Sequence, residues 1–265
     1  MILGKNIMQP SDPRPDFSLV RRNLVKAGAR LAALAGATLL GTGRAGAGPL
    51  FCFLRGTPVL TASGERRVED LAIGDLLVTQ SGGLRPITWV GHYGYRRSDT
   101  SRPWVADARP VRIARSALAA NVPDRDLFVT KGHALFIDGV LVPVGSLLNG
   151  DTISLDAAEE FDALEFFHIK LETHDVIFAA NTPCETLLGV NENARNFASY
   201  TRLYGEPRTD EVPCHPLLAF NGGRSELSSR LRSALACILD RRTRLDTIRD
   251  RLEARAEAMK AGVAA

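Results

Sequence analysis

Short apolar runs separated by turn residues are the feature that most limits how this 265-residue chain can fold. Through residues 57–90 such runs follow one another at intervals of roughly ten residues, and Gly, Asp and Ser stand between them. This spacing is typical of an all-β domain built from hairpins. The pair Asp138-Gly139, between two apolar runs, is a signal for a two-residue hairpin turn. The body of the chain is therefore expected to be mainly β.

The same reasoning predicts further strands at residues 111–113, 127–137, 166–171 and 176–180. Residues 93–104 are rich in Arg, Ser, Asp and Thr and are interpreted as a long polar loop. Residues 116–120 are compatible with a helical turn. Beyond the β body, residues 191–216 are irregular and polar.

The C-terminal region carries a helical pattern. Apolar residues recur at spacings of three and four from Leu227 to Met259, which predicts one long amphipathic helix or two shorter ones. Arg241 and Arg255 interrupt the apolar stripe. This favours a helix packed on the β body, or a broken helical pair, over a coiled coil. The basic outer face is interpreted as solvated rather than as a membrane or partner contact.

Charge and cysteine content exclude several classes of protein. The formal net charge is +3, but residues 1–47 hold seven Lys/Arg against two Asp/Glu, so the remainder is net acidic. This argues against nucleic-acid binding by the main body. Four widely spaced cysteines form neither a disulfide framework nor a C-x-x-C zinc site. One Cys184–Cys214 bridge stays open if the protein is exported.

Residues 1–47 have the order of a signal peptide: a charged front, an apolar middle and an Ala-Gly-Ala end. The adjacent Arg21-Arg22 is similar to a twin-arginine (Tat) signal, which predicts the Tat translocase as a partner and a periplasmic or secreted location. Arg30 interrupts the apolar stretch, so no stable membrane span is expected. The alternative is an amphipathic N-terminal helix. The expected organisation is a leader at 1–47, a β domain at 48–190 and a linker with helix at 191–265.

Three residues suggest chemistry. Cys52 lies where the β pattern begins, and Thr130 and His133 lie together in the apolar run of residues 127–136. A thiolate is a strong nucleophile, and an imidazole both gives and takes protons near neutral pH. A thiol at the first residue of a β domain, with a Thr-x-x-His pair further along, suggests attack on the peptide bond just before Cys52. The alternatives are a small buried cysteine and a structural Thr/His pair.

Seven motifs in order extend this pattern. They are Cys52-Phe-Leu-Arg-Gly-Thr-Pro, Val68-Glu-Asp-Leu-x-x-Gly-Asp75, Ile87-Thr-Trp-Val-Gly91, Pro110-Val-Arg-Ile113, Arg125-Asp-Leu127, Thr130-Lys-Gly-His133 and Phe167-His-Ile-Lys-Leu-Glu-Thr-His-Asp-Val-Ile177. Together they resemble bacterial Hint domains, relatives of hedgehog autoprocessing domains and inteins. The resemblance covers residues 50–190. It implies the Hint fold of short strands and hairpins, here followed by the C-terminal helical segment.

The resemblance also implies a reaction, an N-to-S acyl shift at Phe51–Cys52 that gives a thioester. His133 would protonate the departing nitrogen and Thr130 would orient the bond. The chain has no His-Asn pair of the kind that completes splicing, and a sterol acceptor does not suit a Tat substrate. Water or a small thiol or amine is therefore the expected acceptor. The substrate is the chain's own N-terminal segment, which is cleaved without ligation.

Three further residues are candidates for the site. His168 and His174 are six positions apart and either assist the second step or make structural hydrogen bonds. Asp126 either tunes His133 or caps a turn. No His spacing here is typical of a zinc site, so no metal and no cofactor are expected.

Two other functions compete with self-processing. One is a catalytically silent Hint-like interaction module, which is a real alternative because Tat exports folded proteins and fast cleavage would detach the leader too early. The other is a Cys/His hydrolase acting on other molecules, which requires an open cleft.

Overall fold

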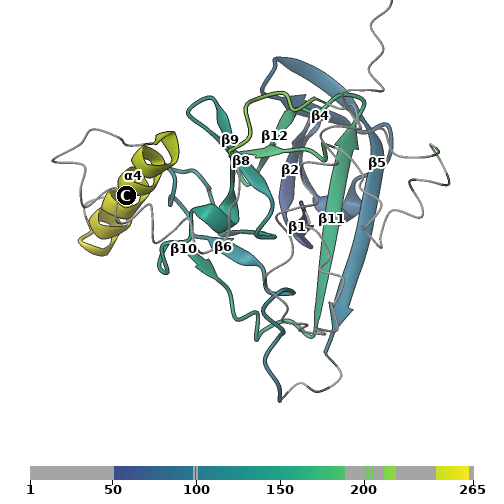
Figure 1. Ribbon diagram of the computed structural model, residues 1–265. Helices are drawn as coiled ribbons and strands as arrows, with labels where there is room; N and C mark the ends of the chain where they lie inside the picture. The colour runs from purple at the N-terminus through teal and green to yellow at the C-terminus, as the bar shows by residue number, and fades with distance from the viewer. Residues whose placement is uncertain are drawn as a thin grey trace, which may run out of the picture. The chain divides into compact units, whose positions relative to one another are not determined.

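The computed structural model describes residues 51–97, 99, 101–188, 200, 202, 205, 212–218 and 243–262. Within these ranges the protein is mainly β, with one α-helix near the C-terminus (Figure 1). The fold class predicted from the sequence is confirmed. The expected leader and most of the region between the β body and the helix, including Arg241, lie outside the described residues.

The elements follow one another in short segments. They are β1 (Phe53–Leu54), β2 (Pro58–Thr61), β3 (Gly64–Arg67), η1 (Val68–Asp70), β4 (Leu76–Thr79), β5 (Gly83–Arg96), β6 (Val111–Ile113), β7 (Leu127–Val129), β8 (Ala134–Ile137), β9 (Val140–Pro143), η2 (Val144–Ser146), β10 (Ile153–Leu155), β11 (Ala163–Leu171), β12 (Val176–Ala179), β13 (Thr182–Glu185) and α4 (Arg244–Lys260).

All named strand pairs are antiparallel. The strand order is β10-β6-β7-β1-β11-β5-β4-β2-β12-β13-β8-β9, and β3 pairs with β2. The long strand β5 joins the two halves of this path, because its first residues pair with β4 and the rest pair with β11. In Figure 1, the long strands β5 and β11 run beside each other.

The two-residue strand β1 positions the start of the domain. Phe53 pairs with Val129 of β7 on one side and with Phe167 of β11 on the other. Its side chain is buried in the main core, and Leu54 lies in a second apolar cluster. The residues just before β1 are therefore held where β7 ends and β11 passes.

Turn chemistry explains the predicted hairpin. Asp138 and Gly139 connect β8 to β9, with φ angles of 51° and 80°. A type I′ turn requires positive φ at both positions, and Asp and Gly tolerate it best. This hairpin is confirmed.

Two local predictions are wrong. Residues 93–96 continue β5 and pair with β11 instead of forming part of a loop. Tyr93 and Tyr95 alternate with exposed Gly94 and Arg96. The segment is polar because one face of the strand is exposed to solvent. Residues 116–120 form turns and an isolated bridge instead of a helical turn, and Ser116 has a φ of 61° that a helix cannot accept.

The helix α4 packs on the β body, as the interrupted apolar stripe suggests. Thr243 caps its N-terminus through a capping box with Asp246. Ile248 and Leu252 are buried in the main core. Arg255 is tolerated on the stripe because its Nε donates to the Ser116 carbonyl at 2.5 Å. In the described part of the chain, no helix combines the length and apolar character needed to cross a membrane.

Candidate active site around Cys52

Cys52 and Thr130 face each other at the ends of β1 and β7. The Cys52 backbone N–H donates to Thr130 Oγ1 at 3.0 Å, and the Thr130 backbone N–H donates to the Cys52 carbonyl at 3.0 Å. The pairing of Phe53 with Val129 places these two residues opposite each other. The nitrogen of the Phe51–Cys52 peptide bond is therefore held by a hydroxyl oxygen from a segment far along the chain.

The carbonyl of the same peptide bond is held by His168. This residue lies on β11, opposite Gly91 of β5. Its Nδ1 is 2.9 Å from the Phe51 carbonyl oxygen, and its Nδ1 and Nε2 are 3.4 and 3.2 Å from Cys52 Sγ. A carbonyl oxygen only accepts hydrogen bonds, so Nδ1 carries the proton and Nε2 offers a lone pair beside the sulfur.

The protonation state of His168 agrees with this tautomer. Burial lowers the pKa of His168 to about 4, against the opposing effect of the Phe51 carbonyl. The imidazole is therefore neutral at neutral pH. A neutral ring can hydrogen-bond the carbonyl at one nitrogen while it accepts a proton at the other.

His133 is a second buried histidine whose pKa is affected by the Phe51 carbonyl. Its ring is 1% exposed and contacts the Phe53 ring edge-on, with centroids 4.4 Å apart. Burial lowers the pKa of His133 to about 3, His168 acts in the same direction, and the Phe51 carbonyl opposes both. Among the described residues, neither ring nitrogen has a partner within hydrogen-bond geometry. Most buried polar side chains in folded proteins have a hydrogen-bond partner, so His133 is unusual in this respect.

The thiol of Cys52 is fully buried. Its Sγ donates to the Tyr93 hydroxyl at 3.4 Å. Burial raises the pKa of the Cys52 thiol above its usual range, while the hydrogen bonds with Tyr93 and Thr130 act in the opposite direction. The resting sulfur is therefore a protonated thiol, and it needs a base before it can attack.

Sequence reasoning missed Tyr93. It treated residues 93–104 as a polar loop, whereas Tyr93 lies in the second half of β5. The signal was present as alternation, because Gly91, Tyr93 and Tyr95 share one face of an extended strand.

His174 lies in a separate buried polar group. Its Nδ1 accepts from the Cys214 backbone N–H at 3.0 Å, and its Nε2 is 3.6 Å from Glu185 Oε2. Glu185 in turn accepts from the Ala134 backbone N–H at 2.7 Å. These contacts join β13, the segment at residues 212–218 and the start of β8. They connect His174 to the neighbour of His133 rather than to Cys52.

Asp126 is engaged at a turn. One of its carboxylate oxygens accepts from Arg112 Nε at 2.7 Å and the other from the Arg115 backbone N–H at 2.8 Å. These bonds tie the start of β7 to the end of β6. The structure thus brings Cys52, Thr130, His133 and His168 together, and it engages Asp126 and His174 elsewhere.

Two further cysteines lie among the described residues, and Cys237 lies outside them. Cys184 is buried and Cys214 is exposed, and both are free thiols. Burial raises the pKa of Cys214 to about 11, with Asp175 and Glu185 adding to the shift. In the described ranges, no three His, Cys, Asp or Glu side chains gather as they would around a metal ion.

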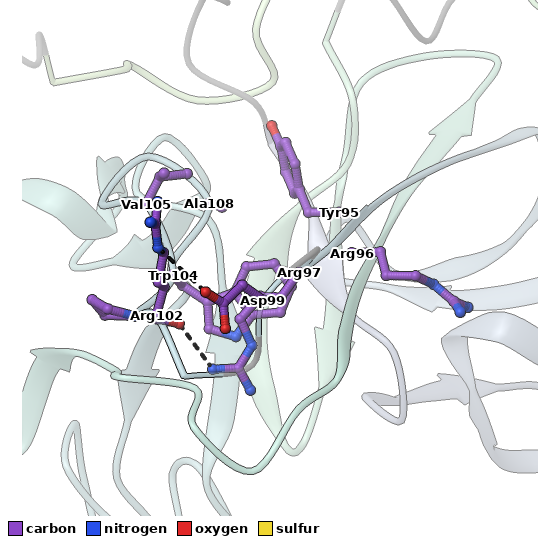
Figure 2. A pocket seen from close by; sticks show the side chains of 9 residues that line it. Tyr95, Arg96, Arg97, Asp99, Arg102, Trp104, Val105 and Ala108 are labelled. Carbon is purple, nitrogen blue, oxygen red and sulfur yellow. Dashed lines mark hydrogen bonds and ion pairs between the residues drawn. The ribbon is translucent and has the colours of Figure 1, made fainter.

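A groove of about 240 Å³ opens at the far end of β5 (Figure 2). Its lining residues are Tyr95, Arg96, Arg97, Asp99, Arg102, Pro103, Trp104, Val105 and Ala108. Arg97 lies over the Trp104 ring at 5.1 Å and donates to the backbone carbonyls of Arg102, Glu159 and Phe161. Trp104 also belongs to the apolar cluster that contains Cys52. Arg97 therefore helps to hold Trp104, a member of that cluster, in place.

The chain matches one family model and is similar to several solved structures. Residues 51–191 match the model of the Hint domain family. The solution structure of a bacterial intein-like domain from Clostridium thermocellum is 15% identical with a TM-score of 0.37, over 52% of this chain and 99% of that one. The crystal structure of the MchDnaB-1 intein is 15% identical with a TM-score of 0.34, over 50% and 98%. The DnaB intein from Synechocystis sp. PCC 6803 is 13% identical with a TM-score of 0.33, over 51% and 98%. A search of curated proteins finds no match.

Proposed function

Because the chain belongs to the Hint domain family, we propose that it is a self-processing domain that cleaves its own backbone between Phe51 and Cys52. The observation that carries this proposal is the set of contacts made to the atoms of that one peptide bond and to the Cys52 sulfur. Thr130 holds its nitrogen, His168 holds its carbonyl oxygen, and the Cys52 thiol lies against His168. Side chains from β11 and from the residue just after β7 thus converge on one peptide bond.

The first step is an N-to-S acyl shift. The Cys52 sulfur forms a bond to the Phe51 carbonyl carbon, and the bond from that carbon to the Cys52 nitrogen breaks. The proton that leaves the thiol is balanced by the proton that the nitrogen gains as it becomes an amine. The product is a thioester, and no oxidant or cofactor takes part.

His168 acts at both ends of the attack. Its Nε2, 3.2 Å from the sulfur, accepts the thiol proton. Its Nδ1–H, on the Phe51 carbonyl oxygen, stabilises the negative charge that develops there as the sulfur adds. The depressed pKa keeps this ring neutral before the reaction, so both nitrogens are in the required state.

His133 and Thr130 act on the leaving nitrogen. An amine leaves only when it is protonated, so the nitrogen requires a proton donor nearby. His133 is buried beside this peptide and has ring nitrogens unpaired among the described residues, so it serves as the relay. Thr130 accepts the Cys52 N–H and fixes the rotation of the peptide while the bond breaks.

The thioester is then cleaved by water or by a small thiol or amine. With water, Phe51 becomes a free carboxylate and the Cys52 thiol is restored. The released piece is the segment before Cys52, which includes the expected leader. For a Tat substrate, we propose that cleavage follows export, so that the periplasm receives the domain with Cys52 as its first residue.

Burial distinguishes this function from hydrolysis of other proteins. Cys52 is 0% exposed, and His133 and His168 are each 1% exposed. An external peptide has no access to such a thiol, whereas the chain's own Phe51 is already bound there. The site therefore favours an internal substrate.

The test is a fusion with a reporter placed before Phe51, incubated with and without dithiothreitol and analysed by mass spectrometry. We expect scission at Phe51–Cys52 that the thiol accelerates and that Cys52→Ala abolishes. The matched control is Cys184→Ala, which removes another buried thiol and should cleave normally. A fusion that stays intact under every condition would instead favour a silent interaction module.

A further inference from the structure

We propose that Tyr93 is a further catalytic residue, whose hydroxyl accepts a hydrogen bond from the resting Cys52 thiol and donates one to the thiolate during attack. This inference rests on the proposed acyl shift. Thr130 and His168 bind the peptide bond that breaks, whereas Tyr93 binds the Cys52 sulfur that attacks it.

Packing fixes the Tyr93 hydroxyl beside the sulfur. The Tyr93 ring stacks on Phe166 with centroids 5.4 Å apart and contacts Tyr95 edge-on at 5.7 Å. On the other side it lies 5.7 Å from the His168 ring. The ring is thus held between β5 and β11, and the 3.4 Å distance from Sγ to the hydroxyl follows from this position.

Tyr93 and Thr130 are the two side-chain hydroxyls that hydrogen-bond the Cys52 sulfur in the described part of the chain. The titratable groups that interact with the sulfur or with the Tyr93 hydroxyl are His168 and Tyr95. The Nδ1–H of His168 is bound to the Phe51 carbonyl, and its Nε2 has no proton until it receives the one from sulfur. In the absence of a donor, burial strongly disfavours the charged sulfur. A phenol hydroxyl can reverse its role because it both donates and accepts.

The proton balance of the step leaves Tyr93 unchanged. The thiol hydrogen turns from the Tyr93 oxygen to His168 Nε2 and is transferred there. The Tyr93 O–H then rotates to point at the negative sulfur, which forms its bond to the Phe51 carbonyl carbon. Burial raises the pKa of Tyr93 above its usual range, so the hydroxyl keeps its proton throughout.

The test compares Tyr93→Phe with Tyr95→Phe in the reporter fusion, and thiol-induced scission is measured from about pH 5 to pH 10. Tyr93→Phe keeps the ring and loses only the hydroxyl. We expect its rate to fall by about tenfold or more across this pH range, because the developing thiolate loses a hydrogen-bond donor. Tyr95→Phe loses a neighbouring phenol hydroxyl and should keep the parent profile.

A second measurement separates lost chemistry from lost folding. The midpoint of urea unfolding of Tyr93→Phe should stay close to that of Tyr95→Phe while its rate of scission falls. A Tyr93→Phe fusion that cleaves as fast as the parent overturns the inference, and so does a loss of rate that only follows a loss of stability. Should the parent fusion itself stay intact, the proposed function is lost, whereas normal cleavage of both tyrosine variants refutes the role of Tyr93 alone.

Discussion

Single residues divide the work at the Phe51–Cys52 peptide bond. Thr130 holds the nitrogen, His168 the carbonyl oxygen, and His168 and Tyr93 the sulfur. The nitrogen, the oxygen and the sulfur thus have different sets of partners, so substitutions at Thr130, His168 and Tyr93 should affect the proposed reaction differently.

Thr130→Val is the sharpest test of the hold on the nitrogen. Valine keeps the branched shape but removes the oxygen that accepts the Cys52 N–H. The loss of this hydrogen bond should slow scission by about ten- to one-hundredfold, equivalent to roughly 1–3 kcal/mol. The rate is measured by single-turnover cleavage of the reporter fusion. Thr130→Ser retains the oxygen and should stay within a fewfold of the parent, and an equal loss in both variants would contradict the assignment.

The residues of the site were predictable to different degrees. Cys52, Thr130 and His133 stood out because a thiol at the start of a β pattern and a Thr-x-x-His pair are visible in one dimension. The contacts of His168 with Phe51 and Cys52 were not predictable, because they depend on the register between β11 and β5. Sequence order alone does not specify that register.

At the scale of elements, β5 positions the site through one glycine. A Cβ atom on Gly91 would meet the Trp89 ring at 2.1 Å. Trp89 stacks against His168 with centroids 6.3 Å apart and lies in a cluster that includes Phe51. The Trp89 ring thus occupies the space that a side chain at position 91 would need. This ring packs against both His168 and Phe51.

Gly91→Ala should therefore displace Trp89 and destabilise the domain. Overpacking of this kind costs about 1–3 kcal/mol. We expect a lower midpoint in urea unfolding and slower scission, because His168 loses its support. Gly94→Ala is the control in the same strand, where the nearest atom is a backbone oxygen at 3.3 Å, and its effect should be smaller. Equal midpoints for Gly91→Ala and the parent would refute this account.

The elements themselves were largely readable from local chemistry. The Asp138-Gly139 turn and the short apolar runs identified the strands, since turn geometry and alternation are local properties. The continuation of β5 through Tyr95 was hidden, because pairing with β11 decides it and the composition is polar. The placement of β1 between β7 and β11 was likewise beyond local reasoning.

For the whole molecule, two buried neutral histidines make stability depend on pH. The pKa values of His133 and His168 are about 3 and about 4 in the folded protein, below the value near 6.5 of an unfolded chain. The unfolded state therefore binds more protons as the pH falls below about 6.5. Stability is fully present above that pH and is lost toward pH 4.

The expected loss between pH 7 and pH 4 is on the order of 2–3 kcal/mol for each histidine. Urea unfolding at several pH values measures it. Replacement of His168 by Gln should flatten the dependence, although it also removes the bond to Phe51. His92→Gln changes an exposed histidine on β5 and should leave the slope as in the parent. Identical slopes for both variants would show that the buried ring does not govern acid sensitivity.

The sequence separation between the partners of Cys52 has a consequence for timing. Thr130 lies 78 positions after Cys52 and His168 lies 116 positions after it. A ribosome making this chain completes the proposed cut site long before it has made Thr130 and His168. We therefore expect the peptide bond to be stable during most of synthesis. The proposed reaction can begin only after β11, which carries His168, has been made and has folded against β1.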